Sequence, residues 1–154
     1  MEHFDPLNAA FWYTIGMSIL CGTIIGCERE YRGKPMGVRT SILICLSCAV
    51  FVHLGLTNSN PAGDPARVLG QIVTGVGFLG AGVILAKDGR VTGVTTAAVI
   101  WLLAAIGSSV GFGQLWGALT LSIIAVCVLV GIEHIDKQLK KFMAGKHKNT
   151  NTPL

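Results

Sequence analysis

The residues of this chain that could carry out binding chemistry are concentrated in one polar segment, residues 28–40. The segment reads EREYRGKPMGVRT and lies between two apolar runs. Its candidate functional residues are Glu28, Arg29, Glu30, Arg32, Arg39 and Thr40. Two interpretations fit this composition: an ion-paired loop with a structural role, or a site at which the three arginines recognise a partner protein or an anionic ligand.

A magnesium site is a third interpretation of the same segment. Glu28 and Glu30 are two residues apart, so they cannot share one face of a helix. A site of two carboxylates within one helix is therefore disfavoured. Mg²⁺ can be bound by one or two carboxylates plus water, so a site completed by another segment stays open. We predict no metal site and no cofactor.

The charges of this segment also predict local ion pairs. Glu28 precedes Arg32, and Glu30 precedes Lys34, by four residues. This spacing, with the acidic residue first, favours ion pairs if the preceding helix continues that far. Pro35 is expected to end the helix and to turn the chain.

Two other motifs could carry chemistry, but their surroundings do not suit it. Residues 75–80, GVGFLG, match a dinucleotide-binding pattern, yet Val99 lies where an acidic residue is needed and no β-α-β unit surrounds them. Cys45-x-x-Cys48 lies in an apolar run without a second pair, which favours a structural role. No Ser/His/Asp or Cys/His constellation is visible, so we do not expect an enzyme.

The composition points to a membrane protein. The mean hydropathy is +0.62 and 13% of residues are charged, against roughly 25% in soluble domains. The net charge is +4, but the basic residues lie at the ends of apolar runs and no aromatic residues alternate with them. Nucleic-acid binding is therefore not expected, and the lipid bilayer is the expected environment.

The apolar runs predict an all-α bundle of about five transmembrane helices. The expected spans are residues 9–26, 41–56, 68–85, 94–110 and 115–132. Residues 1–8 are an expected extracytoplasmic tail, residues 9–132 the transmembrane domain and residues 133–154 a basic cytoplasmic tail. From residue 132 the tail has the pattern of an amphipathic helix lying on the inner membrane surface, or alternatively of an extension of the last span into water. Residues 145–154 are expected to be disordered.

The span at residues 68–85 is expected to be the centre of this bundle, because small residues allow close helix packing in lipid. The candidate helix-packing residues are Gly70, Thr74, Gly75, Gly77, Gly80, Ala81 and Gly82. Five helices need not cover every smooth face, so self-association is a further expectation. At the start of the fourth span, Thr95 and Thr96 are expected to cap the helix or to bond to its carbonyl groups.

The distribution of basic residues predicts the orientation. With five spans, one side of the membrane holds every Lys and Arg except Arg67. Basic residues accumulate on the cytoplasmic side. We therefore predict that the N-terminus lies outside and the C-terminus inside.

Three motifs together resemble a known family. They are residues 25–30, IGCERE, followed by Arg32, Gly37, Arg39 and Thr40; residues 75–82, GVGFLGAG; and residues 93–98, GVTTAA, followed by Trp101. In this order and spacing the chain resembles the MgtC/SapB family of bacterial inner-membrane proteins, from about Gly16 to Glu133. Cys27 stands where the family usually has a larger aliphatic residue. Many members add a cytoplasmic ACT-like domain, so the chain resembles a short form without it.

The resemblance implies a multi-pass protein of the bacterial inner membrane. Some members are linked to survival at low magnesium and inside host phagocytes, and one branch acts through the membrane part of ATP synthase. It thus implies a virulence-associated regulatory or stress-adaptation factor that acts through a membrane partner. The alternative function is transport of Mg²⁺ or another small ion or solute, although co-regulation with a transporter is not itself transport.

Overall fold

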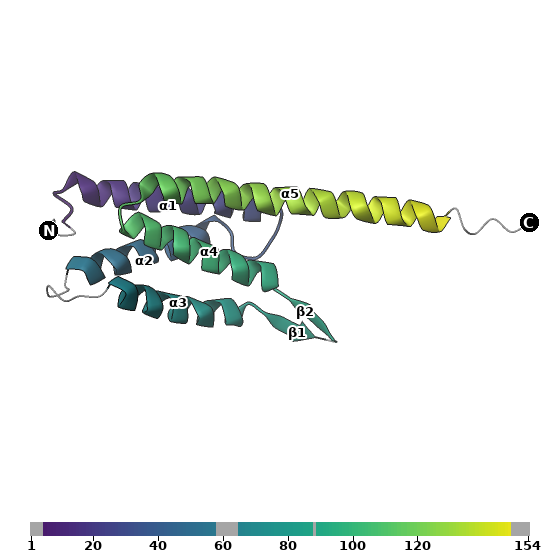
Figure 1. Ribbon diagram of the computed structural model, residues 1–154, viewed down its shortest axis with the longest axis horizontal. Coiled ribbons are helices and arrows are strands. Elements are labelled where there is room, and N and C mark those ends of the chain that lie inside the picture. Colours follow the sequence, from purple (N-terminus) through teal and green to yellow (C-terminus); the bar gives the residue numbers. More distant parts are fainter. Residues whose placement is uncertain (1–4, 58–64, 88, 149–154) are drawn as a thin grey trace, which may run out of the picture.

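The computed structural model describes residues 5–57, 65–87 and 89–148 of the chain. Within these residues it consists of five helices and one short hairpin (Figure 1). In chain order the elements are α1 (Ala9–Tyr31), α2 (Val38–Thr57), α3 (Pro65–Gly82), β1 (Leu85–Lys87), β2 (Arg90–Thr92), α4 (Val94–Gly111) and α5 (Leu115–Lys148). The helices run side by side in alternating directions from α1 to α4, and α5 runs parallel to α1.

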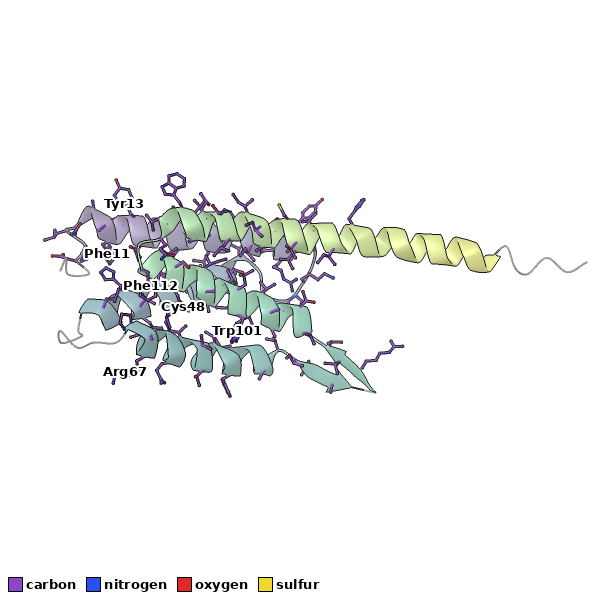
Figure 2. All side chains as sticks on the ribbon, viewed as in Figure 1. Phe11, Tyr13, Cys48, Arg67, Trp101 and Phe112 are labelled. Atoms are coloured by element: carbon purple, nitrogen blue, oxygen red, sulfur yellow. The ribbon has the colours of Figure 1, made fainter. Side chains whose placement is uncertain are left out.

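The structure confirms an all-α membrane architecture. Among the described residues, four helices are long and apolar enough to cross a membrane: Ala9–Tyr31, Val38–Leu56, Val94–Gly111 and Leu115–Ile132. Their outward side chains are apolar, and Figure 2 shows Tyr13 at the outer surface, where it is 68% exposed. Exposed apolar surface of this extent suits contact with lipid. The described part of α3, which includes Arg67 and Gln71, is not among the four, although it runs the length of the bundle.

The centre of the bundle is α2, which lies between α1 and α4. Each neighbour approaches it with two glycines four residues apart. A Cβ at Gly22 or Gly26 would come within 2.6 Å of a backbone Cα of α2. A Cβ at Gly107 or Gly111 would overlap the carbonyl oxygen of Cys45 or Ala49. Small residues that allow backbones to touch are typical of helix contacts in membranes, so these four glycines set the spacing of the three central helices.

Several of the α2 residues that meet these glycines are themselves small. Ser41, Cys45 and Ala49 are fully buried at successive four-residue steps. The hydroxyl of Ser41 donates to the carbonyl of Gly37 at 3.0 Å, so burial leaves it satisfied. One row of small side chains thus lies against both neighbouring helices.

The prediction that residues 68–85 form the centre is wrong. α3 lies at the edge of the bundle and buries only Ile72, Val76 and Gly80. Of the candidate packing residues, Gly80 contacts Ala97 of α4, whereas the others are exposed or have open space beside them: Gly70, Thr74, Gly75, Gly77, Ala81 and Gly82. A packing role for that outer face stays a prediction for a second molecule.

The chain after α3 also differs from the expected span. The helix ends at Gly82, and Leu85 pairs with Thr92 in the antiparallel hairpin of β1 and β2. The sequence Asp88-Gly89 between the strands is typical of a two-residue hairpin turn, and Gly89 has a φ of 73°. Gly93, with a φ of 88°, then brings the chain against the carbonyl of Val83 before α4 begins.

The C-terminal region is helical but not a separate surface helix. α5 continues without a break for 34 residues to Lys148, which corresponds to about 51 Å at 1.5 Å per residue. No Gly or Pro interrupts residues 132–144, and those residue types end helices most readily. Of the two expected arrangements, a surface helix and an extension of the last span, the structure shows the extension. Residues 145–148 are helical rather than disordered, and residues 149–154 lie outside the described part.

The glycine contacts predict a contrast between two matched substitutions. Gly107→Ala places a methyl group against the α2 backbone and should cost about 2 kcal/mol, within the range for overpacking. The midpoint of thermal unfolding in detergent should fall by about 4–8 °C. Gly77→Ala, in open space, should leave the midpoint unchanged or raise it, since Ala favours helix. Equal midpoints for both variants would contradict α2 as the centre.

Candidate functional site

The last two turns of α1 place Glu28 and Arg29 on the buried side of the helix, and the chain then turns sharply. The N–H of Gly33 donates to the carbonyl of Glu30 at 3.0 Å, and the N–H of Lys34 donates to the carbonyl of Arg29 at 2.9 Å. Gly33 has a φ of 61°. This is a Schellman motif, in which a left-handed residue satisfies the final carbonyls of a helix. It turns the chain toward α2 within seven residues.

The charged side chains of this turn are only partly paired as predicted. The expected pair forms between Glu28 Oε1 and Arg32 Nε at 2.9 Å. Glu30, expected to pair with Lys34, instead accepts a hydrogen bond from the N–H of Val38 at 3.1 Å. A carboxylate at the N-terminus of α2 is favourable, because the free N–H groups of a helix carry partial positive charge there. Glu30 thus fixes the beginning of α2.

Arg29 joins α1, the following loop and α4. Its side chain is buried, with the residue 3% exposed. One guanidinium nitrogen, Nη2, donates to Thr96 Oγ1 at 2.9 Å and to the carbonyl of Pro35 at 3.3 Å. These two acceptors are neutral. The contact brings together two sets of candidate residues that lie 67 positions apart in the sequence.

Glu28 contributes a second buried polar group at the same place. Its side chain is 7% exposed, and Oε2 has no hydrogen-bond partner within the described residues. A buried carboxylate oxygen without a donor is costly. Such a group in a native structure points to a ligand or a water molecule that supplies the donor.

A cavity of about 980 Å³ opens beside these residues, between α1, α4, α5 and the hairpin. Polar side chains line one end of it: Glu28, Arg29, Lys34, Thr92, Thr95 and Thr96. Apolar side chains of α4 and α5 line the remainder, among them Val99, Leu102, Leu121, Ile124, Val128 and Ile132. The cavity therefore combines a polar end with an apolar groove.

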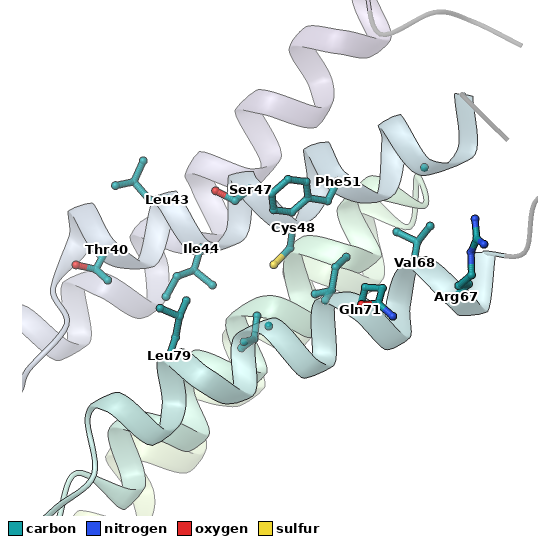
Figure 3. Close-up of a pocket in the computed structure, with 14 residues that line it drawn as sticks. Thr40, Leu43, Ile44, Ser47, Cys48, Phe51, Arg67, Val68, Gln71 and Leu79 are labelled. Atoms are coloured by element: carbon teal, nitrogen blue, oxygen red, sulfur yellow. The ribbon is translucent and has the colours of Figure 1, made fainter.

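The remaining candidates of the polar segment lie elsewhere. Arg39 is exposed on the first turn of α2, and Thr40 lines a different groove of about 910 Å³ between α2 and α3. Figure 3 shows Thr40 at one end of this groove and Arg67 at the other, with apolar residues such as Leu43 and Phe51 along it. The structure therefore separates Arg39 and Thr40 from the Arg29 site, which consists of Glu28, Arg29, Arg32 and Thr96.

The cysteine motif has a packing role in the described chain, and the glycine motif lies within a helix. Cys45 and Cys48 are buried free thiols, and the thiol of Cys45 lies 3.6 Å from the carbonyl oxygen of Leu103. Figure 2 shows Cys48 in the interior of the bundle. Residues 75–80 lie inside α3, and no strand precedes them within residues 5–57 and 65–74. Across the ranges that the structure describes, no three His, Cys, Asp or Glu side chains group closely enough to hold a metal ion.

The Arg29 contact predicts different effects for two neighbouring threonines. Thr96→Val removes the hydroxyl that accepts from the buried guanidinium and should cost about 1.5–3 kcal/mol, as for hydrogen bonds to charged groups. Thr95→Val, whose side chain is exposed, should change the free energy of unfolding by less than about 0.5 kcal/mol. Denaturant titration in detergent measures both values. A cost for Thr96→Val no larger than for Thr95→Val would show that the contact contributes nothing.

Comparison with known proteins places the chain among bacterial membrane proteins. A family model described as the MgtC family matches residues 15–138. Protein MgtC of Salmonella typhimurium (strain LT2) is 43% identical over 124 residues, which are 80% of this chain and 53% of that protein. The putative magnesium transporter YhiD of Escherichia coli (strain K12) is 43% identical over 111 residues, 63% of this chain and 48% of that protein.

An uncharacterized protein of Haemophilus influenzae is 36% identical over 138 residues, 84% of this chain and 57% of that protein. No solved structure matches. The chain spans about half the length of the curated relatives that it matches. The matched region runs from the second turn of α1 into the extension of α5, so it includes every residue of the Arg29 site. The chain therefore belongs to the MgtC family.

Proposed function

We propose that this chain is a regulatory or stress-adaptation protein of the bacterial inner membrane, which acts by binding a membrane partner at the Arg29 end of its bundle. The observation that carries the proposal is the gathering of Glu28, Arg29, Arg32 and Thr96 at one end, with apolar side chains along the rest of the cavity. Such an arrangement can recognise a charged or polar group at the membrane surface. No catalytic step is proposed.

The same observation favours binding over transport. An ion that crosses a membrane needs polar groups along its path, usually at mid-membrane depth. In the described residues the buried charged side chains are Glu28 and Arg29, both in the last two turns of α1. The groove that leads away from them toward Leu102 and Leu121 is apolar.

We propose the orientation of the bundle from its charged end. Figure 1 shows that the turn after α1, the hairpin and the extension of α5 lie at one end, whereas the start of α1 and the turn between α4 and α5 lie at the other. Every Lys and Arg except Arg67 belongs to the first end. By the positive-inside rule we assign this end to the cytoplasm, with the N-terminus outside. α3 is then a fifth span.

The partner is proposed from the family resemblance rather than from geometry. The membrane part of ATP synthase is the first candidate, and the role is adaptation to magnesium limitation and survival inside host cells. The site suits a protein partner because its surroundings remain accessible: Tyr31 is 93% exposed, and Arg39 is exposed on the first turn of α2.

Transport of Mg²⁺ or another small solute is the alternative function. Two observations favour it: one relative is named a putative magnesium transporter, and the cavity of about 980 Å³ is large enough for a hydrated ion. A site for Mg²⁺ there would use the free oxygen of Glu28 plus water, since Mg²⁺ accepts one or two carboxylates.

Flux across vesicles that contain only this protein separates the two functions. The regulatory proposal predicts no protein-dependent flux of Mg²⁺, K⁺ or H⁺, because the spans offer no polar path. Correct insertion is confirmed by protease protection, and a known channel in parallel vesicles shows that flux is detectable. Clear flux that Glu28→Gln abolishes would contradict the proposal and make the chain a transporter.

Labelling of single cysteines by a membrane-impermeant thiol reagent tests the orientation. Cys27 and Cys127, the exposed cysteines, are changed to Ala in the background. Gln114→Cys, in the turn before α5, should react in intact spheroplasts. Tyr31→Cys, at the basic end, should react only in inverted vesicles. The opposite pattern would place the basic end outside, and reaction of both in spheroplasts would show that α3 does not span.

A further inference from the structure

The cavity beside Arg29 has the dimensions of one membrane leaflet. Its apolar part follows α5 from Leu121 to Ile132, twelve residues whose eleven steps span about 16 Å at 1.5 Å per step. The hydrocarbon core of a bilayer is about 30 Å thick, so this groove covers about half of it. The polar residues lie at the end of the groove that meets the membrane surface.

The polar end of the cavity carries both positive charges and a hydrogen-bond acceptor, which together complement a headgroup that has a phosphate and a hydrogen-bond donor. Arg29 and Lys34 supply positive charge, and Thr95 adds an exposed hydroxyl. Glu28, whose carboxylate is held by Arg32, keeps its second oxygen buried and without a donor. The site therefore offers cations for a phosphate and one acceptor for an N–H or O–H group near that phosphate.

We propose that this cavity is a binding site for one phospholipid of the cytoplasmic leaflet. The phosphate lies at Arg29 and Lys34, a hydrogen-bond donor of the headgroup bonds to Glu28 Oε2, and one acyl chain fills the groove between α4 and α5. Ethanolamine and glycerol headgroups both carry such a donor, whereas choline does not. The inference goes beyond the proposed regulatory role, since the lipid binds whether or not a protein partner does.

The exposure of the groove favours a lipid over a second copy of the chain. Ile124 is 51% exposed, Val128 49% and Ile132 57%, so the groove opens sideways to the bilayer along its length. Basic pockets between transmembrane helices on the cytoplasmic side are known to hold lipid headgroups. The glycine-rich surface that suits another helix lies on α3. No residue of α3 lines this cavity; Val83 and Leu85, which follow α3, do.

Lipid retention measured by native mass spectrometry tests the proposal. The purified protein is titrated with phosphatidylethanolamine, phosphatidylglycerol and phosphatidylcholine that share the same acyl chains. The ethanolamine and choline lipids have the same net charge and differ in the donor. We expect the ethanolamine and glycerol lipids to bind about tenfold more tightly than the choline lipid, the factor that corresponds to one hydrogen bond to a charged group.

Two carboxylate variants assign this preference to a residue. Glu28→Gln should remove the preference, because the carboxylate acceptor is lost. Glu30→Gln is the matched control: its carboxylate, two residues away, bonds to the N–H of Val38 and does not line the cavity. It should keep the full preference. Equal binding of all three lipids by the unmodified protein would overturn the proposal.

A third variant tests the acyl-chain groove independently of the carboxylate. Val128→Trp adds bulk on the lipid-facing side of α5 and should weaken retention of all three lipids. If sn-glycerol 3-phosphate instead binds as tightly as the lipids, and Val128→Trp has no effect, the site accepts a free phosphate compound and the lipid assignment is wrong. Thermal unfolding of each variant confirms that retention is compared between folded proteins.

Discussion

The close approach of α1 and α4 to α2 is the constraint on which the rest of the structure depends. In lipid there is no hydrophobic driving force between helices, because the lipid tails are as apolar as the side chains. Close contacts between backbones and satisfied polar groups therefore decide the packing. Gly22 and Gly26 provide such contact on one side of α2, and Gly107 and Gly111 provide it on the other. The three helices therefore have one spacing, which larger residues at these positions would not permit.

The functional site is a consequence of this spacing. α1 and α4 do not carry large mutual surfaces, but both lie against the same row of small residues on α2. Their ends are thereby close enough for Arg29 to reach Thr96 at 2.9 Å. A buried cation next to lipid is expensive unless its donors are satisfied, and the Schellman turn that exposes the carbonyl of Pro35 to Arg29 helps to meet this cost.

Local chemistry explains what the sequence could predict. The membrane class follows from composition, four of the expected spans coincide with apolar helices, and the Glu28–Arg32 pair follows from its spacing. The sequence Asp88-Gly89 is typical of a hairpin turn, but strands of three residues are too short for a periodic signal.

Contacts between distant segments explain what the sequence could not predict. Arg29 and Thr96 are 67 residues apart, and no local pattern relates them. Residues 68–85 were predicted to be the centre of the bundle because they are rich in glycine. The number of glycines does not reveal whether a glycine faces a neighbouring helix or open space. Gly107 and Gly111 have the same four-residue spacing as Gly22 and Gly26, yet the expected span of residues 94–110 stops one residue before Gly111, the last residue of α4.

A double-mutant cycle between Gly26→Ala and Thr96→Val measures most directly whether the glycine contacts position the site. Each unfolding free energy is determined in detergent. Gly26 lies one turn before Arg29, so a methyl group there should move Arg29 away from α4. We expect Thr96→Val to lower the free energy of unfolding of the unmodified protein but to lower it little in the Gly26→Ala background, with a coupling of about 1 kcal/mol or more. Costs that add within about 0.3–0.5 kcal/mol would contradict it.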